Sequence, residues 1–581
     1  MDTKVVILTA FMVGATVLGL LTAESGAARA QTAPPISSRI APPGTLPTAI
    51  DLNPGAQIAP RKSTRTDVFS PPEPGPCPFV RSELVFRLEG VDIVGATRLA
   101  EKDEAEATAG LTGRDIPVSS ICEIRDRLSR ALFRRGVLAR VEVPEQVINQ
   151  GRLKLLVVEA RIVSVRVHGD IGPVQAKVEA YLDHLRNQTP FDLDAAQRYL
   201  LLTNDIPGVH ATAVLRASTH VAKDAQQGAI DLDVTVTRVA SDNVVAVQNT
   251  GSETVGPWSE VGRLDFNSAT RFGERTTLIA YATSDFREQL VAQGVEQFRL
   301  GANGLFGQVS AVYGVSHPGG SLEPLKLDNQ SFVGTAELDY PLVRLERESL
   351  SLGAGLDVVN QTTTFPTGAT LTNDSLRILW IKSDMTGVLP VSPDLLLKGA
   401  GTISLRKGIL ALGASPHGAI DLSRSEGLSD AMDGRIEADV HAVIRHALDL
   451  SAHVQAQYAA KPLLAYEQLE VGSLTIGRGY DPAAASGDLG MATEFKAQYD
   501  AIHLWRWGAI SPYVFYDIAS IDSHDTGSQH IELHSFGGGL RAGLPYGLTA
   551  DVYYAVPEDK PFPAALNKPP ARLYVGVVLA H

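Results

Sequence analysis

The stretch LDLSAHVQAQYA, residues 448–459, decides the fold. Apolar side chains occupy every second position from Leu448 to Tyr458, and polar ones fill the positions between them: Asp449, Ser451, His453, Gln455 and Gln457. Successive side chains of a β-strand point to opposite faces, so this pattern predicts a strand with one apolar and one polar face. Strands of about ten residues with this alternation are typical of barrels that cross an outer membrane.

The same alternation continues through the C-terminal part of the chain. It is clear in GQVSAVYGVS (307–316), LSLGAGLDV (350–358), SFGGGLRAGL (535–544) and RLYVGVVLAH (572–581). A soluble β-sandwich also alternates, but the long strands and the export signal described below favour a closed barrel, which leaves no strand edge in lipid. At about 21 residues per strand and turn, the 342 residues from 240 to 581 predict about 16 antiparallel strands.

The N-terminus has the layout of a secretory signal. Lys4 precedes an apolar run from Val5 to Leu21, and Ala28 and Ala30 supply small residues before a cleavage site. We therefore expect residues 1–30 to be a signal peptide. An N-terminal membrane anchor is the alternative, although the run is shorter than the ~20 residues of a spanning helix. The proline-rich residues 31–78 predict an extended periplasmic leader without a packed core.

Charge and cysteine content narrow the class of protein. The net charge of −14 gives no electrostatic footprint for nucleic acid, so no nucleic-acid partner is expected. The chain has two cysteines, Cys77 and Cys122. In an exported protein such a pair predicts a disulfide, and two free thiols are the alternative.

Two small α/β units precede the predicted barrel. In residues 79–162, a strand-like stretch (82–95) is followed by a helix from Ser120, which we expect to be capped by that hydroxyl and by Glu123 in a capping box. Two strands follow this helix. Residues 163–238 repeat the theme with a strand, a helix over residues 174–185, a second helix over 193–204 and two strands. This tandem repeat predicts two domains, with the barrel in residues 239–581.

Several motifs resemble those of two-partner secretion outer-membrane transporters, the haemolysin secretion/activation protein family. The similar stretches are ICEIRDRLSRALFRRG (121–136), VPEQVINQGRLKLLVVEARI (143–162), RYLLLTNDIPGV (198–209) and VQNTGSETVGPWSEVGRLDFN (247–267). The resemblance implies a transmembrane antiparallel β-barrel of 16 strands preceded by two polypeptide-transport-associated (POTRA) domains. It covers essentially the whole chain after the signal.

The most specific stretch is GSLTIGRGYDPAAASGDLGMATEF, residues 472–495. It resembles a loop of the family that folds into the barrel and carries an Arg-Gly-Tyr signature, here Arg478, Gly479 and Tyr480. In PYVFYDIAS (512–520), period two places Asp517 in the row that faces the lumen. We expect a bidentate Arg478–Asp517 pair to anchor the loop. A solvated Arg478 in an extracellular loop is the alternative.

Three positions depart from the family pattern. Gly477 precedes the signature arginine where a β-branched residue is frequent, and Ala519 stands in place of a glycine. The chain ends in His581 rather than in an aromatic residue, although His581 falls on the outward row of the last predicted strand. A histidine at the last position would affect how the barrel-assembly machinery recognises the chain.

The sequence predicts a translocation pore and no enzyme. We find no nucleophile elbow, glycine-rich nucleotide loop or zinc-type cysteine set, and His441, His446 and His453 lack a metal-ligand spacing, so no cofactor and no metal are expected. The expected partner is a secreted exoprotein of the haemolysin or adhesin type. The barrel would lie in outer-membrane lipid with its N-terminal domains in the periplasm. The alternative function is an outer-membrane protein insertase; a passive porin would not explain the two α/β domains.

Overall fold

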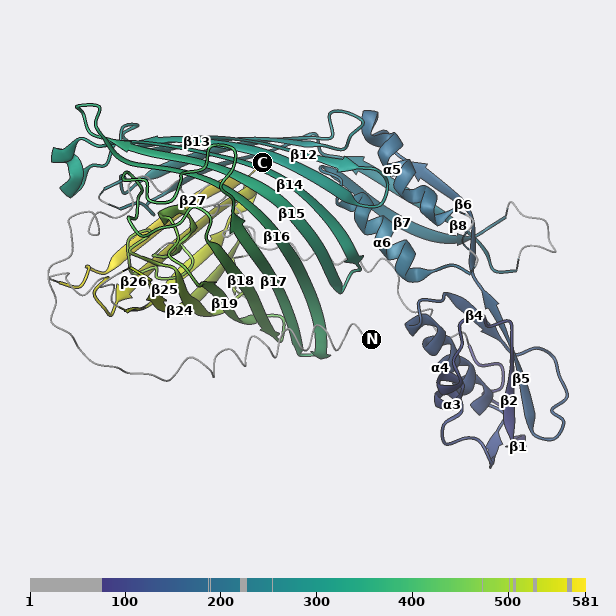
Figure 1. Ribbon diagram of the computed structural model, residues 1–581. Helices are drawn as coiled ribbons and strands as arrows, with labels where there is room; N and C mark the ends of the chain where they lie inside the picture. The colour runs from purple at the N-terminus through teal and green to yellow at the C-terminus, as the bar shows by residue number, and fades with distance from the viewer. Residues whose placement is uncertain are drawn as a thin grey trace.

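The computed structural model describes residues 76–580, apart from residues 187, 189, 220–226, 253, 473, 501, 505–507, 526–529 and 562–566. Figure 1 shows a large barrel with two small domains in line at one end. The signal predicted in residues 1–30, most of the leader predicted in residues 31–78, and His581 lie outside the described residues.

The C-terminal part closes into an antiparallel barrel, as predicted. Sixteen strands form the wall, and β23 (Ile502–His503) is a short addition that pairs with β24. Antiparallel pairing between the last strand, β27, and the first, β9, closes the barrel. The strands are β9 (Ser241–Gln248), β10 (Ser259–Asn267), β11 (Arg275–Thr283), β12 (Gln289–Leu300), β13 (Leu305–Ser316), β14 (Asp328–Arg344), β15 (Glu348–Thr364), β16 (Thr370–Ser392), β17 (Leu395–Gly408), β18 (Met432–Ile444), β19 (Leu448–Ala459), β22 (Leu489–Tyr499), β24 (Ala509–Asp522), β25 (Ile531–Gly543), β26 (Leu548–Pro557) and β27 (Arg572–Ala580).

Side chains alternate between the two faces of the wall. On β24, Val514 is 60 % exposed and Tyr516 38 % exposed, whereas Phe515 and Asp517 are buried inside the barrel. The predicted placement of Asp517 in the inward row is therefore confirmed. An apolar exterior and a polar interior are what a barrel in lipid requires.

The first α/β unit contains a three-stranded sheet in the order β2-β5-β4. The side chains of one helix face, among them Ile121, Ile124, Leu128 and Leu132, pack in its core. The elements are β1 (Val85–Leu88), β2 (Gly90–Val94), α3 (Glu101–Thr108), β3 (Arg114–Pro117), α4 (Ser120–Arg134), β4 (Ala139–Glu142) and β5 (Arg152–Glu159). Helix α3 was not predicted.

The predicted capping box at the start of α4 is wrong. The helix begins at Ser120, but its N-cap residue is Ser119, whose backbone is already helical and whose side chain makes no cap hydrogen bond. The Glu123 side chain forms an ion pair with Arg127, one turn later in the helix, and therefore does not cap the first turn. A pair of this spacing lies on one side of a helix.

The second unit has the predicted order of elements: β6 (Arg161–His168), α5 (Gln175–Leu182), α6 (Leu193–Asn204), β7 (Val209–Ala217) and β8 (Ala229–Arg238). Its sheet has the order β6-β8-β7, and both helices pack on it around a core that includes Tyr181 and Phe191. The Asp192 carboxylate accepts a hydrogen bond from the Ala195 amide and so caps α6. No helix in the described part of the chain is long and apolar enough to cross a membrane.

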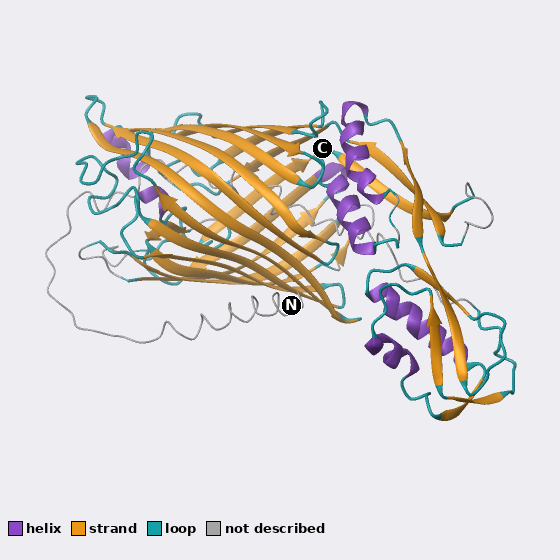
Figure 2. Cartoon of the chain, turned by 45° about the vertical axis from the view of Figure 1, so that its right-hand side comes forward, coloured by secondary structure: helices purple, strands orange, loops and turns teal. Residues whose placement is uncertain are grey.

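Basic side chains of the second unit bind the end of the barrel, where Figure 2 shows the two parts in contact. Lys177 Nζ donates to the carbonyls of Arg299, at the end of β12 (3.2 Å), and of Gly301, in the turn that follows (3.0 Å). Arg198 donates to the Pro341 carbonyl at 2.8 Å. The end of β12, the turn after it and the end of β14 therefore lie at the end of the barrel that faces the small domains.

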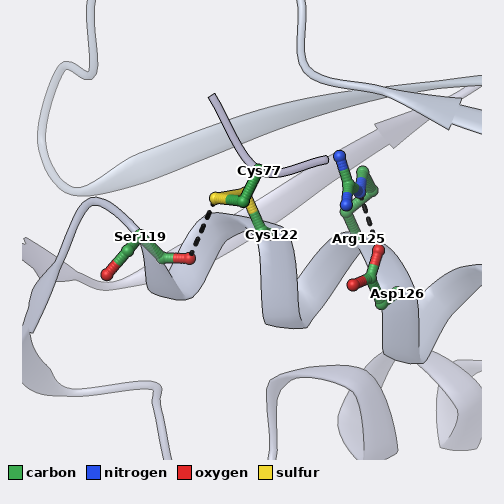
Figure 3. Close-up of a disulfide and its surroundings, with 5 residues drawn as sticks. All are labelled: Cys77, Ser119, Cys122, Arg125 and Asp126. Carbon is green, nitrogen blue, oxygen red and sulfur yellow. Dashed lines mark hydrogen bonds and ion pairs between the residues drawn. A yellow bond between two sulfur atoms is a disulfide. The ribbon is translucent and has the colours of Figure 1, made fainter. Parts of the chain in front are cut away.

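Cys77 and Cys122 are joined by a disulfide with an S–S distance of 2.01 Å, shown in Figure 3. The bond ties the beginning of the described chain to the first turn of α4, where the Ser119 carbonyl lies 3.9 Å from Cys77 Sγ. The neighbouring Arg125 and Asp126 form an ion pair at 2.7 Å on the same helix. The leader side of the chain is thus fixed to this helix.

Candidate functional site

The segment between β19 and β22, residues 460–488, folds back into the barrel. It forms a small hairpin of β20 (Leu469–Val471) and β21 (Ala485–Gly487), which is separate from the barrel sheet. The tip of this inward loop carries Arg478, Gly479 and Tyr480. Tyr480 and Arg478 are only 1 % and 6 % exposed. The four sequence-predicted residues Arg478, Gly479, Tyr480 and Asp517 are therefore brought together inside the lumen.

The Arg478 guanidinium binds Glu494 of β22, not Asp517, most closely. Its Nη2 atom forms an ion pair with Glu494 and lies 3.7 Å from Asp517 Oδ1, which is too long for a hydrogen bond. The guanidinium carbon also lies 3.7 Å from the centre of the Phe515 ring. A cation in this position is attracted to the face of the ring. The predicted bidentate Arg478–Asp517 pair is wrong.

Asp517 instead binds the backbone of the loop tip. Its Oδ2 atom accepts hydrogen bonds from the amides of Gly477 (3.1 Å) and Arg478 (2.9 Å) and from Ser535 Oγ (3.1 Å). Arg478 does not form the predicted pair with Asp517 because Asp517 Oδ2 already binds the backbone amides of the loop. The guanidinium of Arg478 therefore reaches Glu494 instead. Asp517 still fixes the loop, but through main-chain contacts.

The next two residues of the signature fit tightly against β25 and the end of β26. A Cβ added to Gly479 would lie 2.9 Å from both Pro557 N and Ser535 Cβ. The Tyr480 hydroxyl donates to the His534 carbonyl at 2.8 Å and accepts from the Asp559 amide at 3.0 Å. The cavity beside Arg478 and Tyr480 measures only about 20 Å³, so the tip fills its part of the lumen.

Two further anchors hold the loop. Arg572 of β27 donates to the Tyr480 carbonyl and to Asp481 Oδ1, each at 2.7 Å. At the base of the loop, Glu467 is 5 % exposed and pairs with Arg406 of β17 at 2.9 Å and with Arg435 of β18 at 3.1 Å. The inward loop is therefore attached to several separate parts of the wall.

A second segment, residues 409–431 between β17 and β18, also folds inward and locks against the first. Arg424 in this segment forms two hydrogen bonds with Asp488, at 2.6 and 3.0 Å. Asp488 is fully buried and also accepts from the amides of Leu463 and His524, at 2.9 and 2.8 Å. A bidentate arginine–carboxylate pair of this kind is strong and directional. We call these two segments the interlocked loops.

The histidines of β18 and β19 are engaged in local pairs. His441 Nδ1 lies 3.0 Å from Asp449, and His453 Nδ1 lies 3.0 Å from Asp439. Within the described ranges, no group of three or more histidine, cysteine or acidic residues is arranged to hold a metal ion.

Sequence reasoning missed several of these residues, among them Glu494, Arg424 and Glu467. Glu494 could have been found, since it lies in the quoted stretch 472–495 and period two places it in the same inward row as Ala492. Arg424 and Glu467 lie in segments without a regular period, so the sequence contained no comparable signal for them.

Comparison with known proteins identifies the family. The POTRA domain of ShlB type matches residues 86–160. The haemolysin secretion/activation protein family ShlB/FhaC/HecB matches residues 233–542, more than half of the chain. The chain belongs to this family. It is an outer-membrane transporter of the two-partner secretion type, with its POTRA domains in the periplasm.

Individual relatives are distant but cover most of the chain. The Heme/hemopexin transporter protein HuxB of Haemophilus influenzae is 22 % identical over 82 % of this chain and 84 % of its own length. The solved structure of CdiB from Escherichia coli covers 88 % of this chain and 94 % of its own, with a TM-score of 0.70 and 16 % identity. CdiB from Acinetobacter baumannii gives a TM-score of 0.61, with 14 % identity, 86 % coverage of this chain and 91 % of its own. These ShlB-family likenesses agree with the barrel and POTRA fold.

Proposed function

We propose that this ShlB-family transporter exports a large haemolysin- or adhesin-type exoprotein, and that the inward loop yields during its passage. The observation that carries the proposal is the buried cluster of Arg478, Glu494 and Asp517. It holds the loop tip in the lumen through charged contacts, beside an apolar cluster that includes Ile476 and Tyr480 of the loop and Leu533 of the wall. Charged contacts can be exchanged for contacts with water or with a passing chain, so such a loop can leave and return.

The POTRA domains, proposed here as residues 79–162 and 163–238, would receive the passenger first. In the second domain β7 is an edge strand, and no strand in the described part of the chain pairs with its outer side. Val214 on this strand is 52 % exposed. An unfolded chain can add to such an edge by backbone hydrogen bonds that tolerate varied sequence.

Other features of the proposal concern biogenesis and the membrane. Residues 1–30 would direct export to the periplasm, the barrel-assembly machinery would insert the barrel, and outer-membrane lipid would surround its apolar rows. The protein would act as a pore without catalysis. Folding of the passenger outside the cell would supply the driving force.

Gene deletion tests export against the alternative of a general insertase. Loss of a single exoprotein from the medium, with normal levels of other barrel proteins, would support the proposal. A broad loss of outer-membrane proteins would support the insertase.

Variants test the role of the loop. Arg478→Ala and Asp517→Ala should each reduce secretion of the exoprotein and alter the conductance of the purified protein in planar bilayers. Arg263→Ala is a matched control, because Arg263 is a lumen-facing arginine that pairs with Asp265 at 2.8 Å without contacting the loop. If the two loop variants behave like this control, the loop has no role in transport.

A further inference from the structure

A groove of about 500 Å³ crosses the outer face of the barrel wall from β11 to β15. Two neighbouring rows of residues, each running from strand to strand in register, form it. The first row is Leu278, Gly294, Ala311, Gly334 and Val358, and the second is Thr276, Glu296, Val309, Ala336 and Leu356.

The groove opens towards lipid. Leu278 and Val309 are 49 % and 47 % exposed, whereas Ile279, the neighbour of Leu278 on the inward face, is buried. Glycine and alanine make the floor of the groove, and larger aliphatic side chains flank it. A Cβ added to Gly294 would meet nothing within 4 Å, so the space above this residue is open.

Glu296 is the one charged residue among those that line the groove. Its Oε2 atom accepts a hydrogen bond from Thr276 Oγ1 at 2.7 Å. It forms no ion pair with any side chain in the part of the chain that the structure describes. A carboxylate on the lipid face of a barrel is unfavourable, so a cation supplied by the surroundings would stabilise this arrangement.

The position of Glu296 along the wall indicates where that cation would come from. Strand β12 ends at Leu300, next to the turn that Lys177 of the second POTRA domain binds. Four residues separate Glu296 from this periplasmic end, which is about 13 Å along the strand. Half of the hydrocarbon core is about 15 Å thick. Glu296 therefore lies in the periplasmic leaflet, within reach of the lipid headgroups.

We propose that this groove binds one phospholipid with a primary ammonium headgroup, namely phosphatidylethanolamine. An acyl chain lies over Gly294, Ala311 and Gly334, and the ammonium donates hydrogen bonds to Glu296. The volume is within the range of about 300–1,000 Å³ that small-molecule sites have. A primary ammonium offers N–H donors, whereas the quaternary ammonium of a choline lipid offers none and an anionic glycerol lipid is repelled. The inference depends on the barrel lying in lipid and not on the identity of the passenger.

The test is lipid retention by the full-length protein in detergent, measured by native mass spectrometry with palmitoyl-oleoyl lipids that carry ethanolamine, choline or glycerol headgroups. The wild-type protein should retain the ethanolamine lipid about tenfold better than the choline lipid, as expected for a charge-assisted hydrogen bond. Glu296→Gln should remove this preference, because the amide keeps the shape and loses the charge.

Two control variants separate the site from general effects. Gly294→Leu should fill the groove and lower retention of all three lipids, whereas Gly262→Leu on β10 lies outside the groove in equally open space and should not. Glu260→Gln removes another outward carboxylate, at the opposite end of the wall, and should leave the preference unchanged. A folded barrel and its heat-unfolded form migrate at different positions in a gel, and this difference verifies that each variant is folded.

Equal retention of the ethanolamine and choline lipids by the wild-type protein would overturn the proposal. So would a Glu296→Gln variant that keeps the preference, or a folded Gly294→Leu variant that retains lipid like Gly262→Leu.

Discussion

Glu494 and Asp517 are register partners on the neighbouring strands β22 and β24, so two lumen-facing carboxylates stand directly opposite each other in the barrel wall. Like charges in this position destabilise a sheet. The guanidinium of Arg478 forms ion pairs with both and offsets their repulsion. Lys496 of β22 also lies 3.7 Å from Glu494 Oε1, but among the described segments the inward loop supplies the cation that pairs with both carboxylates.

This relationship predicts that one substitution has opposite effects in two backgrounds. In the otherwise wild-type protein, Glu494→Gln should destabilise the barrel by about 3–5 kcal/mol, because it removes one partner of a buried ion pair. In an Arg478→Ala background, the same change should stabilise the barrel, because it removes the repulsion from Asp517. The temperature at which gel mobility shifts on heating measures both effects.

Glu337→Gln is the control for this cycle, since Glu337 is a lumen-facing carboxylate of β14 that pairs with Lys382 at 2.7 Å, away from Arg478, and should have the same effect in both backgrounds. Equal effects of Glu494→Gln in the two backgrounds would show that Arg478 and Glu494 are not coupled.

Gly479→Ala should displace the loop tip. The added methyl group meets the backbone of Pro557 and the Cβ of Ser535 at 2.9 Å, and overpacking of this kind costs about 1–3 kcal/mol. We expect larger or longer channel openings in planar bilayers. Gly543→Ala on β25 meets nothing within 4 Å and should conduct like the wild-type protein. Unchanged openings in Gly479→Ala would mean that the tip does not limit the pore.

Arg424→Ala should separate the interlocked loops. It leaves Asp488 buried without its cation, and removing one partner of a buried pair costs about 3–5 kcal/mol. Added protease should then cleave residues 409–431 faster in the folded barrel. His417→Ala breaks a more exposed pair with Asp430 in the same segment and should cost at most about 1 kcal/mol. If the two variants are cleaved at the same rate, the Arg424–Asp488 pair does not hold the loops together.

Reduction of the Cys77–Cys122 bond should loosen the first POTRA domain but not the barrel. The bond closes a loop of 45 residues in sequence separation, and such a loop contributes up to about 4 kcal/mol in the chain-entropy description. Hydrogen exchange of α4 should rise on addition of dithiothreitol, while exchange in β24 stays the same. A Cys77→Ser/Cys122→Ser variant should show the raised exchange without reductant and no further response to it. Identical exchange of α4 in both proteins would rule out a stabilising role.

Local periodicity made the barrel strands and helix α4 predictable, because an alternating or helical stripe depends only on nearby residues. Helix α3 was missed for the same reason. Its sequence, EKDEAEAT, has only Asp103 and Ala107 buried, and Asp103 is stabilised there by an ion pair with Arg135, the residue that follows the end of α4. No apolar stripe marks such a helix.

The site was predictable in part. The period-two pattern of the strand predicted that Asp517 faces the lumen, and the family resemblance indicated the Arg-Gly-Tyr signature of the loop. The partner of Arg478 depends on which carboxylate oxygen the loop backbone has already bound, which is a property of the folded loop. The Arg424–Asp488 contact joins two irregular segments 64 residues apart, so it follows from tertiary structure alone.

The interlocked loops have a consequence for the kinetics of the pore. Asp488 of the inward loop is bound at once by Arg424 of the other loop and by the Leu463 amide of its own loop, so departure of either loop breaks the Arg424–Asp488 contact. Two elements that share a contact tend to switch together rather than by degrees. Single-channel records should therefore show a few discrete current levels with abrupt transitions instead of a continuous spread.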